Sequence, residues 1–438
     1  MDKNNNKSSF DRFGDDLADL ILRYLSLEDQ LRLECVSKQF QSLGIQRRTH
    51  IIFGFNLNQK LRVKPFSTSG YFDTENWSSL MKRSPNVRTI GINTSTSGYR
   101  DIQLIEAIHR FRRHWPLLRQ IDCTIDNYTD KDIEFVCKRF TKMINKMIIY
   151  LFDQIDIIKP YLSSMTALRE LSSIRNIDDT FIGDQLVVKG LHRLSCDRLD
   201  NTWTRDHLKR LETFIDGNSY LKRLKLHFTS MDYNTCVSVL SLIGRFEELE
   251  QLGIRFDLFY HFSIAEPLLT IANSCRRLKS LKLELKADSL VSYKNIFNAI
   301  KHMKQLKRLD LNGFYVINQL NDHMVDPSLS ESLELINCWP HLTHLSLRLS
   351  LYNRHLFWDI HRNLPKLQCL YIDDSFDIID GLCLSFISRL KSLMTLTIDT
   401  KNYKSINKSD VNQVMNSCLK LKSISINSIP NDKSIHSQ

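Results

Sequence analysis

From about residue 85, the hydrophobic and polar positions of this chain follow one recurring pattern. An apolar residue is followed by two residues, an apolar residue, one residue and a third apolar residue. Clear copies begin at residues 221, 249, 278, 306, 342, 367, 393 and 421, and weaker copies begin at residues 87, 118, 144, 168 and 191. The mean spacing is about 28 residues, and the alternation within each copy predicts a short strand.

The segments that precede these copies have helical periodicity. Val411, Val414 and Cys418 fall at i, i+3 and i+7, and Ile296 and Ile300 fall at i and i+4. Each unit is therefore predicted to contain one strand and one helix. Neither element can bury its apolar side alone, so successive units must stack on one another.

This repeat resembles the longer, cysteine-containing class of leucine-rich repeat. The resemblance implies an α/β fold, a horseshoe-shaped solenoid with parallel strands inside and helices outside. Residues 85–430 would form one cooperative array of about 13 repeats. The family's usual Asn or Cys, three residues after the last leucine of the motif, is absent, so we expect an irregular horseshoe. The longest interval, from residue 306 to residue 342, predicts an insertion over residues 317–332.

The head of the chain has a different pattern, with no strand between short helical segments. Leu17, Leu20, Ile21, Tyr24 and Leu25 fall on one face of an amphipathic helix. A head of two or three such helices has too small a core to be very stable alone. We therefore expect it to need a partner, or the first repeat, to cover its remaining apolar surface.

The stretch "YLSLEDQLRLECVSKQF" (24–40) resembles the second half of an F-box, whereas Phe13-Gly14 stands where that family usually has Leu-Pro. The resemblance implies a small all-α F-box-like domain over residues 10–46 that docks on a Skp1-like protein. The residues that would make this contact are Phe13, Leu17, Leu20, Ile21, Tyr24, Leu25, Leu27, Leu31 and Val36. The alternative is a helical cap on the first repeat, although residues 48–57, which read as a strand, can also fill that role.

The remaining segments are a polar tail over residues 1–9, a connecting strand and linker over residues 47–84, and a second polar tail over residues 431–438. The chain has 42% hydrophobic and 25% charged residues, as in ordinary soluble proteins. It has no apolar run long enough to span a bilayer, and because its start is polar and lacks the apolar stretch of a signal peptide, we expect no such peptide. We expect a cytoplasmic protein that can also enter the nucleus, with no membrane partner.

No pattern of catalytic or metal-binding residues is visible. No two of the 13 glycines are close enough for a phosphate-binding loop, and no two of the ten cysteines are spaced as CxxC. Cys275 and Cys418 precede repeat leucines and are expected to be buried. We therefore predict a non-catalytic protein with no cofactor and no bound metal.

The family resemblance implies the substrate-recognition adaptor of a Skp1-cullin-F-box ubiquitin ligase. The head would bind the Skp1-like subunit, and through it a cullin-RING ligase, while the solenoid binds the protein substrate. One alternative is a leucine-rich-repeat scaffold without a ligase, which the Phe13-Gly14 departure favours. Another is a nucleic-acid-binding solenoid, supported only by a net charge of +11. That charge is spread over the whole chain. Cations placed near helix ends, where they complement the helix dipole, are a simpler explanation for it than nucleic-acid binding.

The substrate is expected on the inner strand face of the central repeats. Positions that flank the inward apolar residues are mostly basic there, with only Glu284 and Asp310 as acidic counterparts. Aromatic residues follow the same strands, and arginine with aromatic residues often dominates interface energies. An acidic or phosphorylated segment of the substrate would suit this surface. The alternative is that these lysines and arginines form only a solvated face of a basic protein. The predicted substrate-binding residues are Arg223, Lys225, His227, Arg255, Tyr260, Lys282, Arg308, Tyr315 and Arg348.

Overall fold

The structure of this chain is a computed structural model. It describes residues 14–25, 27–34, 37–47, 50–54, 82, 85–93, 115–125, 130–149, 155–173, 189–200, 203–229, 231–259, 264–287, 293–314, 339–349, 355–374, 379–400 and 406–428. The chain divides into two compact units, Met1–Arg175 and Asn176–Gln438. Each unit is described by itself.

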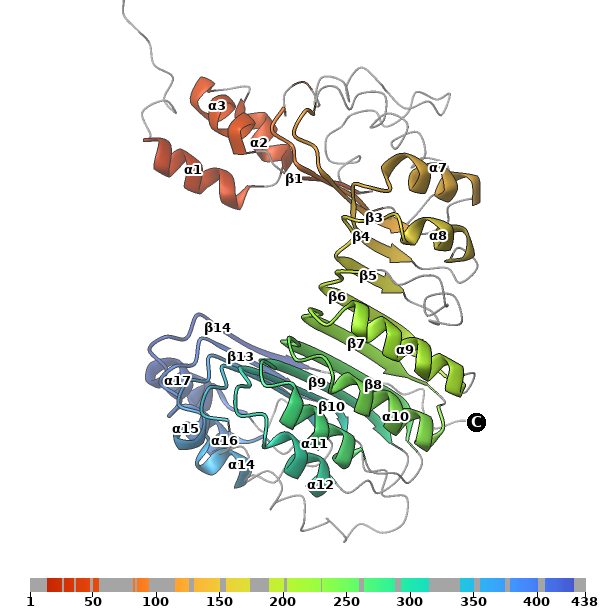
Figure 1. The fold of residues 1–438 in the computed structure, drawn as a ribbon. Helices are drawn as coiled ribbons and strands as arrows, with labels where there is room; N and C mark the ends of the chain where they lie inside the picture. Colours follow the sequence, from red (N-terminus) through yellow and green to blue (C-terminus); the bar gives the residue numbers. More distant parts are fainter. Residues whose placement is uncertain are drawn as a thin grey trace, which may run out of the picture. The chain divides into compact units, whose positions relative to one another are not determined.

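The first unit begins with three helices, which are α1 (Asp15–Tyr24), α2 (Leu27–Glu34) and α3 (Lys38–Arg47) (Figure 1). Ala18, Leu22 and Phe40 form the buried core of this head, and Leu33 and Leu43 pack against it. Gly44 of α3 lies close to Glu34 in α2, and a Cβ at this glycine would meet the carboxylate of Glu34. A larger residue at position 44 would therefore have to displace the side chain of Glu34.

The first unit continues with five strands that pair in chain order. The strands are β1 (His50–Gly54), β2 (Thr89–Asn93), β3 (Gln120–Ile125), β4 (Ile144–Ile149) and β5 (Glu170–Ser173). All four pairings between them are parallel. Helix α7 (Asp130–Phe140) connects β3 to β4, and helix α8 (Ile155–Leu162) lies between β4 and β5.

The second unit repeats the same arrangement over nine strands. Its elements are β6 (Arg193–Leu199), α9 (Arg205–Gly217), β7 (Arg223–Phe228), α10 (Tyr233–Ile243), β8 (Gln251–Phe259), α11 (Ala265–Ser274), β9 (Ser280–Ala287), α12 (Tyr293–Ile300), β10 (Arg308–Phe314), β11 (His344–Leu349), α14 (His355–Trp358), α15 (Ile360–Asn363), β12 (Cys369–Asp374), α16 (Gly381–Ile387), β13 (Thr395–Thr400), α17 (Lys408–Ser417) and β14 (Ser423–Ser428). Each strand pairs in parallel with the next one along the chain.

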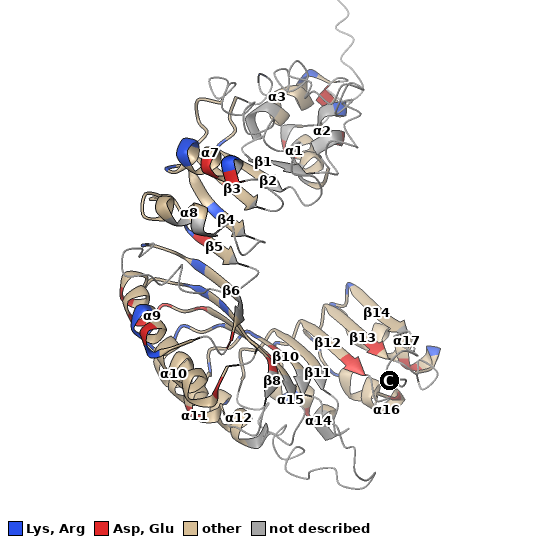
Figure 2. Cartoon of the chain, turned by 90° about the vertical axis from the view of Figure 1, so that its right-hand side faces the viewer, with Lys and Arg blue, Asp and Glu red and all other residues tan. Residues whose placement is uncertain are grey.

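Alternating burial explains why these strands form a single layer. In β7, Leu224, Leu226 and Phe228 are buried, and the residues between them are exposed or half-buried. The register carries this alternation from strand to strand, because Leu252 of β8 pairs with both Leu224 and Leu281. One side of the sheet is thus a continuous apolar surface, and the helices α9–α12 cover it (Figure 2).

Side-chain caps define the starts of some of the helices. Asp232 caps α10 by accepting a hydrogen bond from the backbone N–H of Thr235 at 3.0 Å. Hydrogen bonds from the side chain of Thr235 and then from its backbone N–H keep the pKa of Asp232 below its usual value. Asn407 and Asp410 form a reciprocal capping box at the start of α17. Such caps satisfy backbone donors that the first helical turn leaves without partners.

The repeat prediction is confirmed. A strand begins at the start of every predicted copy or two residues after it, and the strand expected over residues 48–57 is β1. Cys275 and Cys418 are buried, as expected. The predicted insertion over residues 317–332 lies outside the described residues. The single array over residues 85–430 stays a prediction, because the chain divides between Arg175 and Asn176.

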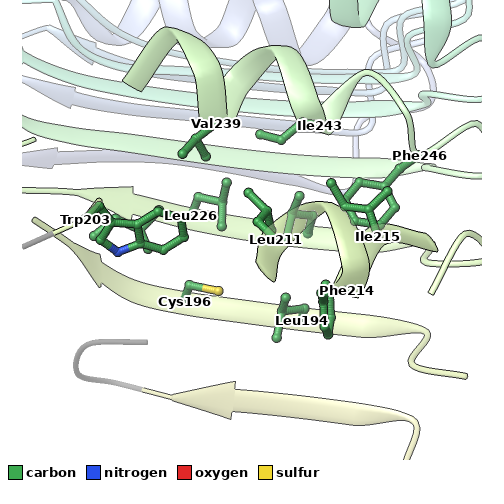
Figure 3. Close-up of a pocket in the computed structure, with 12 residues that line it drawn as sticks. Leu194, Cys196, Trp203, Leu211, Phe214, Ile215, Leu226, Val239, Ile243 and Phe246 are labelled. Carbon is green, nitrogen blue, oxygen red and sulfur yellow. The ribbon is translucent and has the colours of Figure 1, made fainter. Parts of the chain in front are cut away.

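The core of the second unit contains a small cavity between α9, α10, β6 and β7 (Figure 3). Its volume is about 40 Å³, and its walls are entirely apolar side chains that include Trp203, Phe214, Leu226, Val239 and Phe246. This volume has room for about three water molecules, but no polar group is present to hold them. We interpret the cavity as a packing defect rather than a ligand site, because pockets that hold metabolites are roughly ten times larger.

Filling this cavity is expected to stabilise the second unit. Val239 lines the cavity and is 1% exposed, so Val239→Ile adds one methylene group to empty space. The free energy of unfolding should rise by up to about 1 kcal/mol, as measured by denaturant unfolding. Val136→Ile is the matched control, because Val136 of α7 is equally buried and does not line this cavity. A larger gain at Val136 than at Val239 would contradict this interpretation.

Candidate protein-interaction surfaces

The first candidate surface is the outer side of helix α1. Leu17, Leu20 and Tyr24 are 45%, 46% and 84% exposed, although their spacing places them on one helix face. The opposite side of α1 carries Ala18 and Leu22, which fill the core of the head. Helix α1 thus has an apolar side that nothing in the described part of the chain buries.

The other predicted head residues have different positions. Ile21 packs against the core of the head, and Leu25 is half-buried directly after α1. Leu27 and Leu31 belong to α2, but their side chains are not described. Phe13 and Val36 lie outside the described residues. The prediction that this set contacts a Skp1-like protein therefore remains a prediction.

The second candidate surface is the side of the β6–β14 sheet that faces away from the helices, which we call the open face. It carries the side chains that alternate with the buried ones, so each strand contributes every second residue. The register aligns these residues in rows across the sheet. One row runs through Ser195, Lys225, Gly253, Lys282 and Asp310, one residue from each of β6 to β10.

The basic residues of the open face are largely paired with acidic ones. Oδ1 of Asp257 lies 2.9 Å from Nε of Arg255, and its Oδ2 lies 2.7 Å from Nε2 of His227. The carboxylate of Glu284 lies 3.4 Å from Arg255 and 3.7 Å from Lys282. These contacts connect β7, β8 and β9 in one network of charges. A separate pair within β10 joins Arg308 and Asp310 at 2.8 Å.

Two pKa values on this face are displaced from their usual range. Partial burial acts to raise the pKa of Asp257, but hydrogen bonds from Arg255 and His227 together lower it below the ordinary value. The pKa of His344 in β11 is lowered, first by burial and then by the positive charge of Arg308. At neutral pH, Asp257 is therefore charged and His344 is neutral.

The structure brings six of the nine predicted substrate residues together on the open face. They are Arg223, Lys225 and His227 of β7, Arg255 of β8, Lys282 of β9 and Arg308 of β10. Arg348 lies in β11 with a side chain that is not described, and Tyr260 and Tyr315 lie outside the described residues. Sequence reasoning missed Asp257, which continues the alternation of β8 beyond the third apolar position of the motif.

Toward β14, the open face loses its lysines and arginines and carries aspartates and neutral polar side chains instead. Strands β12, β13 and β14 contribute two aspartates and no lysine or arginine at nine open-face positions, which are Cys369, Tyr371, Asp373, Thr395, Thr397, Asp399, Ser423, Ser425 and Asn427. Asp399 accepts hydrogen bonds from the hydroxyl of Tyr371 and, at 2.7 Å, from Nδ2 of Asn427. Figure 2 shows the acidic residues on β12 and β13.

Large apolar side chains are not exposed on the strands of the described chain. Those that are exposed lie on helices or adjoining turns, among them Tyr233, Leu269, Trp358, Leu382 and Met415. On the described strands, the open face therefore presents charged and hydrogen-bonding groups rather than exposed apolar side chains.

Other kinds of site have no support in the described residues. No group of three or more His, Cys, Asp or Glu side chains there is placed to hold a metal ion. Eight described cysteines are free thiols, and burial raises the pKa of the Cys236 thiol to about 12. A thiol with such a pKa is protonated at neutral pH and is a poor nucleophile. Among the described helices, none is both long and apolar enough to cross a bilayer.

The described chain thus has a small helical head followed by parallel strand–helix repeats that are rich in leucine. Residues 10–46 match the F-box domain family. A segment that matches this domain family is thus followed by parallel, leucine-rich strand–helix repeats. The match covers the three helices of the head, apart from the last residue of α3.

Comparisons with whole proteins add little. A search of curated proteins found no match to this chain. Among solved structures, the leucine-rich repeat-containing protein LegL7 from Legionella pneumophila is similar, with 12% sequence identity and a TM-score of 0.30. The similarity covers 85% of this chain and 90% of LegL7.

Proposed function

We propose that this protein is the substrate-recognition adaptor of a Skp1-cullin-F-box ubiquitin ligase. The observation that carries the proposal is the F-box match over residues 10–46. The exposed apolar side of α1, with Leu17, Leu20 and Tyr24, supports it because a docking partner would bury that side. The partner is a Skp1-like protein, and through it a cullin-RING ligase.

The solenoid would hold the protein substrate on its open face. The central strands offer charged side chains in register, and they suit an acidic or phosphorylated segment of the substrate. The adaptor itself performs no chemistry in this proposal. It holds the substrate near a charged ubiquitin-conjugating enzyme, so that transfer becomes effectively intramolecular. The expected location is the cytoplasm, and the nucleus as well.

Direct binding tests this proposal. The purified full-length chain is mixed with a purified Skp1-like protein, and complex formation is followed by size-exclusion chromatography and calorimetry. The expected result is a stable complex of one chain with one Skp1-like protein. Recovery of the chain without the Skp1-like protein, at micromolar concentrations of both, would contradict the proposal and would favour a scaffold without a ligase.

A further inference from the structure

The middle of the open face has one position without a side chain, at Gly253 of β8. The register places Gly253 between Lys225 of β7 and Lys282 of β9 in the same row. Adjacent strands are about 4.8 Å apart, so the two lysine stems are separated by roughly 10 Å. Gln251 and Arg255 are the next open-face residues along β8. We call this position the Gly253 gap.

Neither conformation nor packing requires a glycine at this position. Gly253 does not have a positive φ angle. A Cβ there would lie 3.5 Å from Cγ of Lys225, an ordinary contact, and it would meet no other residue within 4 Å. Glycine within a strand is destabilising relative to alanine. A glycine that folding does not require is typical of a site where another molecule approaches the backbone.

The charges around the gap indicate an anion. Lys225 and Lys282 flank it, Arg255 follows it on β8, and Arg223 lies one strand away in the preceding row. The acidic residues nearby, Asp257 and Glu284, hold Arg255 from two sides and so fix its position. An anionic group in the gap would therefore meet a guanidinium that is held in place, together with the ammonium groups of Lys225 and Lys282.

Toward β12 and β13, the same face is acidic instead of basic. Asp373 and Asp399 are paired in register on β12 and β13, with no lysine or arginine on the open face of those strands. Five strand spacings separate β8 from β13 in the sheet order. That is roughly 24 Å, which an extended chain spans in about seven residues.

We propose that the open face binds an extended peptide segment that is acidic at one end and basic at the other. The acidic side chain enters the Gly253 gap between Lys225 and Lys282. The basic side chain, about seven residues away, pairs with Asp373 and Asp399. The proposal rests on the proposed function for the identity of this segment as a part of the ubiquitin-ligase substrate. The geometry of the face itself does not depend on it.

Peptide selection tests this proposal. A phage library of random 12-residue peptides is selected on the full-length chain and, in parallel, on Gly253→Val. We expect peptides with an acidic and a basic residue six to eight positions apart, enriched at least tenfold less on Gly253→Val. Lys304→Glu is the matched control, because Lys304 is exposed in the turn before β10 and should select the same peptides as the unmodified chain. No enrichment, or peptides without this spacing, would overturn the proposal.

Three further measurements sharpen the test. Gly253→Ala should raise the thermal midpoint of unfolding while weakening the selected peptides, so lost binding cannot be attributed to misfolding. Combined Asp373→Lys and Asp399→Lys substitutions should shift the selection toward peptides with two acidic ends; an unchanged selection would overturn the basic half of the proposal. Synthetic peptides with phosphoserine in place of the selected acidic residue show, by fluorescence anisotropy, which of the two anions binds more tightly.

The peptide selection and the binding test with a Skp1-like protein can fail independently of each other. Binding of a Skp1-like protein by the Gly253→Val chain reports on the head alone. If the unmodified chain selects bipolar peptides but binds no Skp1-like protein, the ligase role fails and the peptide site stands. If it binds the Skp1-like protein and selects no bipolar peptides, the peptide site fails and the ligase role stands.

Discussion

The double substitution Leu20→Lys and Tyr24→Lys is expected to abolish binding of a Skp1-like protein to this chain. Both side chains are exposed, at 46% and 84%, so their replacement removes no contact from the core of the head. Burying each apolar side chain at an interface contributes about 1.5–3 kcal/mol, so the loss of two should weaken binding at least about 100-fold. Lysine at position 24, the last residue of α1, suits the helix dipole, and lysine at position 20 is a good helix former, so α1 should remain folded.

Calorimetric titration measures this effect. Gln41→Lys in α3 is the matched control, because it adds a lysine at another exposed position of the head. The far-ultraviolet circular dichroism of both variants should equal that of the unmodified chain. If the double variant binds as tightly as the control variant, the exposed side of α1 is not the docking surface.

The second large effect is expected in the core of the solenoid. Phe256 of β8 is 1% exposed and stacks on Phe228 of β7, with ring centroids 4.8 Å apart. Phe256→Ala removes this contact and leaves a cavity, which should lower the free energy of unfolding by about 3–5 kcal/mol. In a repeat unit of this size, the thermal midpoint should fall on the order of 10 °C.

Leu269→Ala in the neighbouring helix α11 is the control, since Leu269 is 37% exposed and loses much less on truncation. Hydrogen exchange should show the greatest loss of protection in β7, β8 and β9, because each repeat depends on its direct neighbours. Equal effects of the two substitutions would show that the Phe228–Phe256 stack does not stabilise this part of the array.

The periodic part of the fold could be predicted well from the sequence. Each copy of the apolar pattern places leucine or a similar side chain at two alternate strand positions, as with Leu281 and Leu283 of β9, which are both fully buried. A strand with one buried side is the element that satisfies this alternation, and the interval between copies is long enough for a helix that returns the chain to the start of the next strand. The local sequence therefore predicts where each strand lies. The division of the chain between Arg175 and Asn176 corresponds to no such pattern in the sequence.

The surfaces were harder to predict. The periodicity of α1 is compatible with a core made by Leu17, Leu20 and Tyr24 or by Ala18 and Leu22, and only the packing of Phe40 selects the second. The network around Asp257 was missed because β8 continues beyond the repeat motif. With Asp257 included, the five lysines and arginines of β7–β10 whose side chains are described face three carboxylates.

The meaning of Gly253 could not be read from the sequence either. A glycine within a strand pattern usually indicates a bulge or a turn. Here β8 pairs in unbroken register with β7 on both sides of Gly253. Only the space around its Cα distinguishes a bare surface position from a packing requirement.

The central claim is that the head and the open face bind different proteins. The most direct measurement is quantitative mass spectrometry of the proteins captured from cells by three chains, which are the unmodified chain, Leu20→Lys with Tyr24→Lys, and Gly253→Val. The account predicts that the head variant loses the Skp1-like protein and the cullin but retains the other captured proteins. It predicts the reverse for Gly253→Val. Loss of the same proteins by both variants, or of none by either, would contradict the claim.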